Sequence, residues 1–182
     1  MGIPTLIKTL TASDSASLAF VHGASDVVFD STYDEYMFVF SSIHLRHDTG
    51  KFSWQVNASG QSGYNETITS TSFRTNHSEA DDLAELGYLT SADQAQGTAG
   101  QSINEASIDN ADAAGSGILH LFSPSNTTYV KHFYSVFSDV AYDRANCVYA
   151  AGYVNVTAAL IGIQFSSSGD NFDGVIQMYG IA

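Results

Sequence analysis

Short segments in which apolar and polar residues alternate recur along the whole chain, and this pattern constrains the fold more than any other feature. Alternation with a period of two places neighbouring side chains on opposite faces of a β-strand. It is clearest in 175–181, where Ile176 and Met178 fall on one face and Val175 and Tyr179 on the other. The chain carries only 2 Pro but 10 Tyr and 11 Phe, and aromatic residues favour strands.

Turn-type residues separate about ten such segments. In the ninth segment we place Ile161, Ile163 and Phe165 on one face, and we interpret 166–171 as the hairpin loop that leads to the last segment. The expected strands are Ile3–Thr9, Ser17–Val21, Tyr36–His44, Phe52–Asn57, Thr67–Phe73, Gly117–Ser123, Thr128–Phe137, Cys147–Val154, Leu160–Phe165 and Val175–Ile181.

Many short strands with little helix predict an all-β fold, an antiparallel β-sandwich of jelly-roll-like form. The 182 residues suit a single domain, 1–182, that can bury its own core. No fixed-period repeat and no proline-rich linker divides the sequence.

Residues 76–116 differ from the rest and are expected to form a long polar excursion from the β scaffold. They hold eight of the 19 acidic residues and few large apolar ones. The stretch Ser78–Leu86 predicts a short helix with Ser78 as its N-cap. We expect this excursion to contact neighbours in an assembly, with Leu83, Leu86, Tyr88 and Leu89 as anchors. The alternative is a long surface loop packed on its own sheet.

The charge balance limits the kinds of molecule that the chain is expected to bind. With 6 Lys+Arg against 19 Asp+Glu, the formal net charge is -13, so nucleic acid and anionic membrane surfaces are the partners least expected. No apolar stretch approaches the roughly 20 residues of a membrane span, and the N-terminus lacks the pattern of a signal peptide. The lone Cys147 excludes an internal disulfide and predicts a small buried side chain. We therefore expect a soluble acidic domain without membrane insertion.

Candidate chemical sites were sought among the histidines and carboxylates. His44 and His47 stand close to Asp48, but Arg46 lies between them and would repel a metal ion. The segment Asp170–Gly174 offers oxygen ligands without the register of an EF-hand, so a plain turn is the expected structure. His120 and His132 interrupt alternating strands and are expected on the faces opposite the core.

The carboxylate pairs Asp34-Glu35 and Asp81-Asp82 cannot be placed relative to each other from the sequence, although glycoside cleavage would need two. No Gly-x-Ser-x-Gly motif marks a nucleophile, and no phosphate-binding loop occurs. From the sequence we predict no catalytic residue, no cofactor-binding residue, no metal ligand and no cofactor.

The tyrosines are too many for one core, so some are expected on outer faces or at an interface. Ordinary half-buried strand positions are the alternative. The tyrosines concerned are Tyr33, Tyr36, Tyr64, Tyr88, Tyr129, Tyr134, Tyr142, Tyr149 and Tyr153.

Several stretches of the sequence together carry a resemblance to a known family. They are GILHLFSPSNTTYVKHF (117–133), AGY (151–153), ALIGIQFSSSG (159–169), GVIQMYGI (174–181), and, nearer the N-terminus, DEYMFVFSSIH (34–44), YNETITS (64–70) and SEAD (78–81). With these stretches the chain resembles virion structural proteins of tailed phages, notably those of marine bacteria and cyanobacteria. It departs from the family ending at 169–173, where Gly-Asp-Asn-Phe-Asp replaces a Gly-Asn pair, so the loop before the last strand differs from that of the family.

The resemblance implies a non-enzymatic virion component located in the phage particle, either a capsid-decorating subunit or a tail fibre or tip subunit. Its partners would be other virion proteins. We expect a homotrimer, with a homodimer or a higher ring as the alternative, because symmetric assembly covers exposed strand edges. Two alternatives remain open. One is a carbohydrate-binding module in which the tyrosines and Trp54 contact host-surface glycans, and the other is a small hydrolase.

Overall fold

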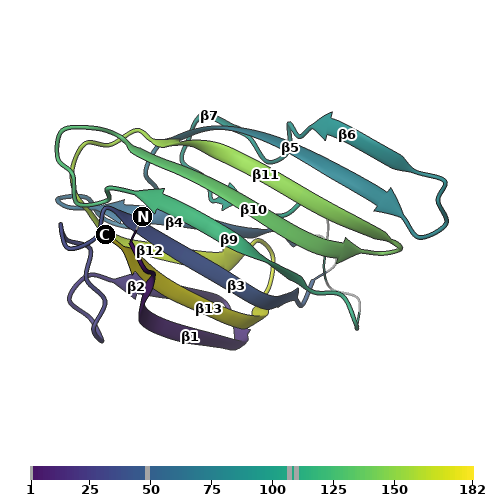
Figure 1. Cartoon of the computed structure of the whole chain (residues 1–182), viewed down its shortest axis with the longest axis horizontal. Coiled ribbons are helices and arrows are strands. Elements are labelled where there is room, and N and C mark those ends of the chain that lie inside the picture. Colours follow the sequence, from purple (N-terminus) through teal and green to yellow (C-terminus); the bar gives the residue numbers. More distant parts are fainter. Residues whose placement is uncertain (1, 48–49, 106–107, 109–110) are drawn as a thin grey trace.

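The computed structural model describes residues 2–47, 50–105, 108 and 111–182, and these residues form two antiparallel sheets packed face to face. Figure 1 shows the two sheets as layers, with the larger sheet in front. The nine-stranded sheet has the order β1-β13-β3-β9-β10-β11-β5-β6, with β7 also paired to β5, and the four-stranded sheet has the order β2-β12-β4-β8. The chain is an all-β sandwich, as the alternating pattern predicts.

Every strand expected from the sequence is present, although several ends differ, most of all that of β1, which runs to Ser15 and not to Thr9. The bounds are β1 (Thr5–Ser15), β2 (Ser17–Val21), β3 (Glu35–Leu45), β4 (Phe52–Ala58), β5 (Ile68–Ser78), β6 (Ala84–Tyr88), β7 (Gln94–Gly97), β8 (Gln101–Ser102), β9 (Gly115–Phe122), β10 (Lys131–Ala141), β11 (Arg144–Val154), β12 (Leu160–Ser167) and β13 (Phe172–Ile181).

The chain passes repeatedly from one sheet to the other, as in a jelly roll. For example, β3 is in the large sheet and β4 in the small one, and β12 and β13 likewise lie in different sheets. The interpretation of 166–171 as a hairpin loop is therefore wrong, because β12 pairs with β2 and β4 while β13 pairs with β1 and β3. A loop of this length can also connect two strands that lie in different sheets. Alternation shows which face each residue occupies, but it does not show which strand pairs with which.

The predicted faces hold with one exception. Ile176 and Met178 of β13 are fully buried, and Ile163 and Phe165 of β12 are fully buried as well. Ile161, which we grouped with them, is only half-buried. The reason is a register shift against β4 between Leu160 and Gly162, since a bulge turns the side chains beyond it to the other face.

Phenylalanine rings from both sheets fill the core. Phe40 of the large sheet meets Phe52 and Phe165 of the small sheet, with ring centroids 5.4 and 5.3 Å apart. Phe137 joins the same cluster, at 6.2 Å from Phe40. A Cβ at Gly117 would lie 2.8 Å from the backbone and the ring of Phe137, so a glycine at that position leaves room for the ring.

The segment 76–116 folds onto the sandwich instead of extending away from it. The expected helix at Ser78–Leu86 is wrong: a turn at 79–83 leads into strand β6, which pairs with β5. The Ser78 hydroxyl accepts hydrogen bonds from the backbone N–H groups of Asp82 and Leu83 at 3.2 and 3.0 Å. The Ser78 hydroxyl thus bonds to backbone N–H groups as a helix N-cap would, but the chain continues as a strand and not as a helix.

Farther along, the same segment joins the two sheets. Strand β7 pairs with β5 of the large sheet and β8 pairs with β4 of the small one. Ile103 and Ile108 are fully buried in the main core, and Leu89 packs with Val148 of β11 in a second cluster. Of the four expected anchors, Leu86 is 71% exposed and Leu83 half-buried. The described part of this segment therefore packs on its own sheets, while Leu86 and Tyr88 stay exposed. Its contact with neighbours in an assembly stays a prediction.

Candidate functional site

The outward side of the large sheet carries a continuous apolar and aromatic surface. The strand register aligns two rows of outward side chains across β3, β9, β10, β11, β5 and β6. We call these rows and Leu86 the outer face; its residues are Val39, Ile118, Val136, Tyr149, Phe73 and Tyr88 in the first row, Met37, His120, Tyr134, Ala151 and Thr71 in the second, and Leu86 at the β6 edge.

The aromatic side chains of the outer face are well exposed for their size. Phe73 is 43% exposed, Tyr88 59% and Tyr134 41%. Phe73 and Tyr149 stack with ring centroids 4.8 Å apart and an interplanar angle of 7°. A cavity of about 180 Å³ lies beside this stack, lined by Thr71, Phe73, Tyr134, Ser135, Val136, Tyr149, Ala150 and Ala151. In the register, the small Ala151 and Thr71 lie beside the large Tyr134, Tyr149 and Phe73, and this difference in size leaves the hollow.

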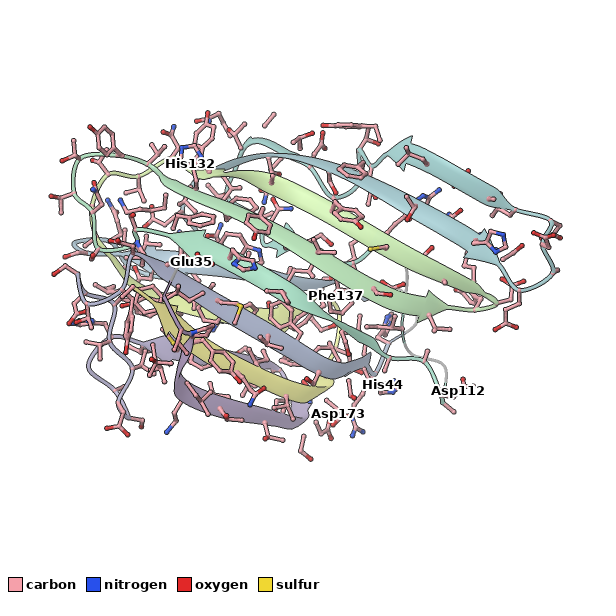
Figure 2. All side chains as sticks on the ribbon, in the orientation of Figure 1. Glu35, His44, Asp112, His132, Phe137 and Asp173 are labelled. Atoms are coloured by element: carbon pink, nitrogen blue, oxygen red, sulfur yellow. The ribbon has the colours of Figure 1, made fainter. Side chains whose placement is uncertain are left out.

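His120 of the outer face is paired with a carboxylate at its border. The His120 ring nitrogen Nδ1 hydrogen-bonds the Glu35 carboxylate, and the ring stacks on Tyr134 with centroids 4.4 Å apart. Burial and the nearby Glu35 charge raise the pKa of Tyr134. Figure 2 places Glu35 and His132 toward one end of the sheet and His44 and Asp173 toward the other. The prediction that His120 and His132 face away from the core is confirmed, because Leu119, Leu121 and Phe133 beside them are buried.

A second surface feature lies at the end of the sandwich, in the loop between β9 and β10. Two adjoining hollows, of about 510 and 320 Å³, share Ser123, Asn126 and Thr128, and we call them together the end cleft. Tyr129, His132 and Thr157 line the larger hollow. The smaller hollow is lined by Tyr33, Asp34, Asn126 and several serine and threonine side chains.

The loop that forms the end cleft is fixed from within. The Asn126 side-chain oxygen accepts hydrogen bonds from the backbone N–H groups of Thr128 and Tyr129 at 2.7 and 2.9 Å. The ammonium group of the fully buried Lys131 donates to the carbonyl oxygens of Tyr129, Val156 and Thr157. Burial lowers the pKa of Lys131. Tyr129 itself is 70% exposed, so a rigid loop presents its ring to solvent.

The histidine and calcium-type candidates are held by other contacts. The His44 Nδ1 atom lies 2.9 Å from the carbonyl oxygen of Ala113. Arg46 forms a two-pronged contact with Asp173, at 2.8 and 3.0 Å, and this lowers the pKa of Asp173. Asn171 donates to the Asp14 side chain at 2.9 Å. Asp48 lies outside the described residues.

The two carboxylate pairs lie apart. Glu35 contacts His120, whereas the Asp82 carboxylate accepts a hydrogen bond from Ser78 at 2.7 Å on the β5–β6 turn. Asp81 lies 3.2 Å from His77 and its side chain is 89% exposed. Among the described residues, no group of three or more His, Cys, Asp or Glu side chains is placed to hold a metal ion.

The carbohydrate-binding alternative placed Trp54 on a sugar-contacting platform, and this placement is wrong. Its side chain is fully buried and packs edge-on against Phe133, with ring centroids 4.8 Å apart. Strand β4 is covered on both faces of the small sheet, so six of its seven residues are buried. Tyr36 is likewise a core residue. The prediction of tyrosines outside the core is confirmed for Tyr88, Tyr129, Tyr134 and Tyr142.

Cys147, expected as a buried residue, is half-exposed and lies two positions before Tyr149 on the same side of β11.

Sequence reasoning missed a buried polar row on the inner side of the large sheet. The register aligns Asp139, Asn146 and Asn76, all at least nine-tenths buried. The Asn146 amide donates to Asp139 at 3.1 Å. Burial raises the pKa of Asp139 to about 6, and the Glu105 charge adds to this effect. One feature of the sequence could have predicted that Asp139 is buried. By the alternation of β10, Asp139 lies on the same face as the core residues Phe133 and Phe137.

Comparisons with protein-family models, with curated proteins and with solved structures give no match. In the part of the chain that is described, no helix is long and apolar enough to cross a membrane.

Proposed function

We propose that this chain is a non-enzymatic structural subunit of a bacteriophage particle, located on the capsid or the tail and assembled with other virion proteins. The outer face is the observation that carries the proposal. It presents aromatic and aliphatic side chains from six adjacent strands, of which Ile118, Phe73, Tyr134, Leu86 and Tyr88 are exposed. Large exposed apolar patches mark surfaces that another molecule covers. The resemblance of 117–181 to virion structural proteins supports the same assignment.

The test is the protein content of purified virions from the phage that encodes the chain. Mass spectrometry of gradient-purified particles is expected to detect its peptides at a fixed ratio to the major capsid protein. Antibody labelling of the particles then distinguishes capsid from tail. Peptides found only in the soluble fraction of the lysate, with none in the particles, would overturn the proposal.

A second candidate function, binding of a host-surface glycan, is favoured by the end cleft. An exposed tyrosine ring offers an apolar platform for a sugar, and the neighbouring Ser, Thr and Asn side chains offer hydrogen-bonding groups. Tyr129, His132 and Asp34 line the two hollows. This site takes the place of the Trp54 platform.

A glycan array probed with the recombinant chain tests this second candidate. If the end cleft binds sugar, Tyr129→Ala abolishes the signal, whereas Tyr142→Ala retains it. Tyr142 is the matched control because it is 65% exposed, close to the 70% of Tyr129, but lies in the β10–β11 turn. A wild-type array without signal, or a signal that both variants retain, excludes the end cleft as the binding site.

A further inference from the structure

We propose that the buried polar row is a pH-sensitive hydrogen-bond relay, in which the Asn146 amide turns over when Asp139 takes up a proton and then donates to Asn76. Three features of the row support this: the direction in which its amides point, the buried oxygens that lack a partner, and the charges at its two ends.

The hydrogen bonds of the row determine which way each amide points. In the strand register, Asn146 of β11 lies between Asp139 of β10 and Asn76 of β5. Its Nδ2 group donates to Asp139 at 3.1 Å, so its oxygen is turned toward β5. The Nδ2 group of Asn76 donates in the other direction, to Glu85 of β6, at 3.0 Å, so its oxygen is turned toward β11. Two amide oxygens therefore face each other between β11 and β5.

This arrangement leaves three deeply buried oxygens without a hydrogen bond from any described residue. They are Oδ1 of Asn76, Oδ1 of Asn146 and Oδ2 of Asp139, on side chains that are 6%, 3% and 3% exposed. Buried polar atoms without partners destabilise a fold. An ionised carboxylate only accepts hydrogen bonds, so a charged Asp139 holds the Asn146 amide in this poorly satisfied orientation.

A single proton removes most of the mismatch. A neutral Asp139 has an O–H group, which can donate to Asn146 Oδ1. A half-turn of that amide about its Cβ–Cγ bond then directs Nδ2 to the oxygen of Asn76. The proton comes from solvent, and the O–H bond of Asp139 is the only covalent bond that forms. The result is one chain of hydrogen bonds from Asp139 to Glu85, across four neighbouring strands of the large sheet (Figure 1).

The charges at the β6 end of the row keep the Asn76 amide fixed, so the Asn146 amide is the one that turns. Glu85 accepts hydrogen bonds from Asn76 and, at 2.6 Å, from Arg74. These two hydrogen bonds lower the pKa of Glu85. Glu85 therefore stays ionised while Asp139 titrates, and it holds the Nδ2 group of Asn76 on its own side.

The surroundings of Asp139 place its proton uptake in a mildly acidic range. Burial, and to a smaller extent the Glu105 charge, raise the pKa of Asp139 to about 6. On the β9 side Asp139 lies opposite Gly115, which brings no charge. The other charged groups near the row, among the residues described, are Arg74 paired with Glu105 and Glu85, Arg144 paired with Asp143, and Lys51 close to Glu105. The relay is therefore complete below about pH 6 and broken above it.

Nuclear magnetic resonance of the isotope-labelled chain at pH 5 and pH 8 tests the inference. Scalar couplings across hydrogen bonds identify the acceptor of the Asn146 Nδ2 group. At pH 8 we expect a coupling to Cγ of Asp139, and at pH 5 a coupling to Cγ of Asn76. A coupling to Asp139 at both pH values, or none to Asn76 at pH 5, would overturn the inference.

Asn76→Ala gives a second measurement. It removes the acceptor that the turned amide needs, so the protonated state of Asp139 loses support. The midpoint of the Asp139 titration, followed by its Cγ chemical shift, is expected to fall by roughly 0.5–1 pH unit, which corresponds to one hydrogen bond. Ser72→Ala is the matched control, because Ser72 is also fully buried on β5 but donates to the carbonyl oxygen of Tyr149. An unchanged midpoint in Asn76→Ala, or an equal fall in both variants, contradicts the relay.

Discussion

At the scale of single residues, two buried ionisable side chains of the sandwich differ in how completely they are hydrogen-bonded. The Lys131 ammonium group has three carbonyl acceptors, at 2.9, 3.3 and 3.1 Å. The Asp139 carboxylate has one amide donor, and its other oxygen, Oδ2, has no hydrogen-bond partner. Burial disfavours both charges, since it lowers the pKa of Lys131 and raises that of Asp139. We therefore expect the loss of Lys131 to weaken the fold, because three acceptors lose their donor, and the loss of the Asp139 charge to strengthen it.

Lys131→Met is expected to destabilise the domain by more than about 2 kcal/mol. The methionine side chain fills similar space, but the carbonyl oxygens of Tyr129, Val156 and Thr157 lose a charged donor, and buried acceptors without partners are costly. Urea denaturation followed by the fluorescence of the single Trp54 measures the loss. Lys8→Met, on the edge strand β1, is the control with a small effect. Equal stability of the two variants would contradict this role.

Asp139→Asn is expected to stabilise the domain at pH 8 and to have little effect at pH 4. Burial raises the pKa of Asp139 from 3.8 to about 6, so the folded state holds the proton more tightly than the unfolded state. The resulting penalty is absent below pH 4, grows between pH 4 and 6, and then stays constant at about 3 kcal/mol. Asparagine removes the charge and keeps an oxygen for the Asn146 amide. Denaturation curves at the two pH values measure the gain, and an equal gain at both would refute the explanation.

At the scale of elements, β13 is an interior strand that joins the edge strand β1 to the rest of the large sheet. Removing residues 175–182 deletes the buried Ile176 and Met178 and leaves β1 without a partner. Each buried side chain contributes roughly 1.5–3 kcal/mol, against a total of about 5–15 kcal/mol. The truncated chain is expected to be insoluble or to lack a cooperative melting transition by calorimetry. A soluble, cooperatively melting product would show that the strand is peripheral.

Replacing residues 90–115 with a short Gly/Ser linker is expected to prevent folding. The segment supplies β8, which pairs with β4, and the fully buried Gln101, Ile103 and Asn104. The Gln101 side chain also bridges layers, since its oxygen accepts from Ser70 at 2.7 Å. Replacing the exposed turn 59–63 with Gly/Ser is the control, and its circular dichroism spectrum should match that of the wild type. If the 90–115 replacement also kept that spectrum, the segment would be a dispensable arm.

These elements also show how much of the fold the sequence could predict. Alternation identified the ten main strands because it depends only on which face each residue occupies. It could not identify β7 and β8, since Gln101, Ser102 and Asn104 are buried through hydrogen bonds and not through hydrophobicity. The helix expected at Ser78–Leu86 failed because the capping signal of Ser78 also suits a turn.

The candidate sites could be predicted less well, since they depend on which strands are neighbours. Tyr134, Tyr149 and Phe73 are distant in sequence, and only the order β10-β11-β5 places them around one cavity. Trp54 was misplaced because a tryptophan in a strand covered on both sides has the same local sequence pattern as an exposed one. The abundance of tyrosine did indicate that some would lie outside the core, but not which.

At the scale of the whole molecule, the pairing of β1 with β13 has a consequence for synthesis on the ribosome. Strand β1 ends at Ser15 and its partner begins at Phe172, and β2 likewise pairs with β12. At about 5–20 residues per second, the N-terminal strands wait roughly 10–30 s before their partners are translated. During that interval Phe20 and the apolar residues of β1 have no sheet to join, so the nascent chain depends on chaperones or on rapid completion. The sandwich can therefore close only after residues 172–181 have left the exit tunnel.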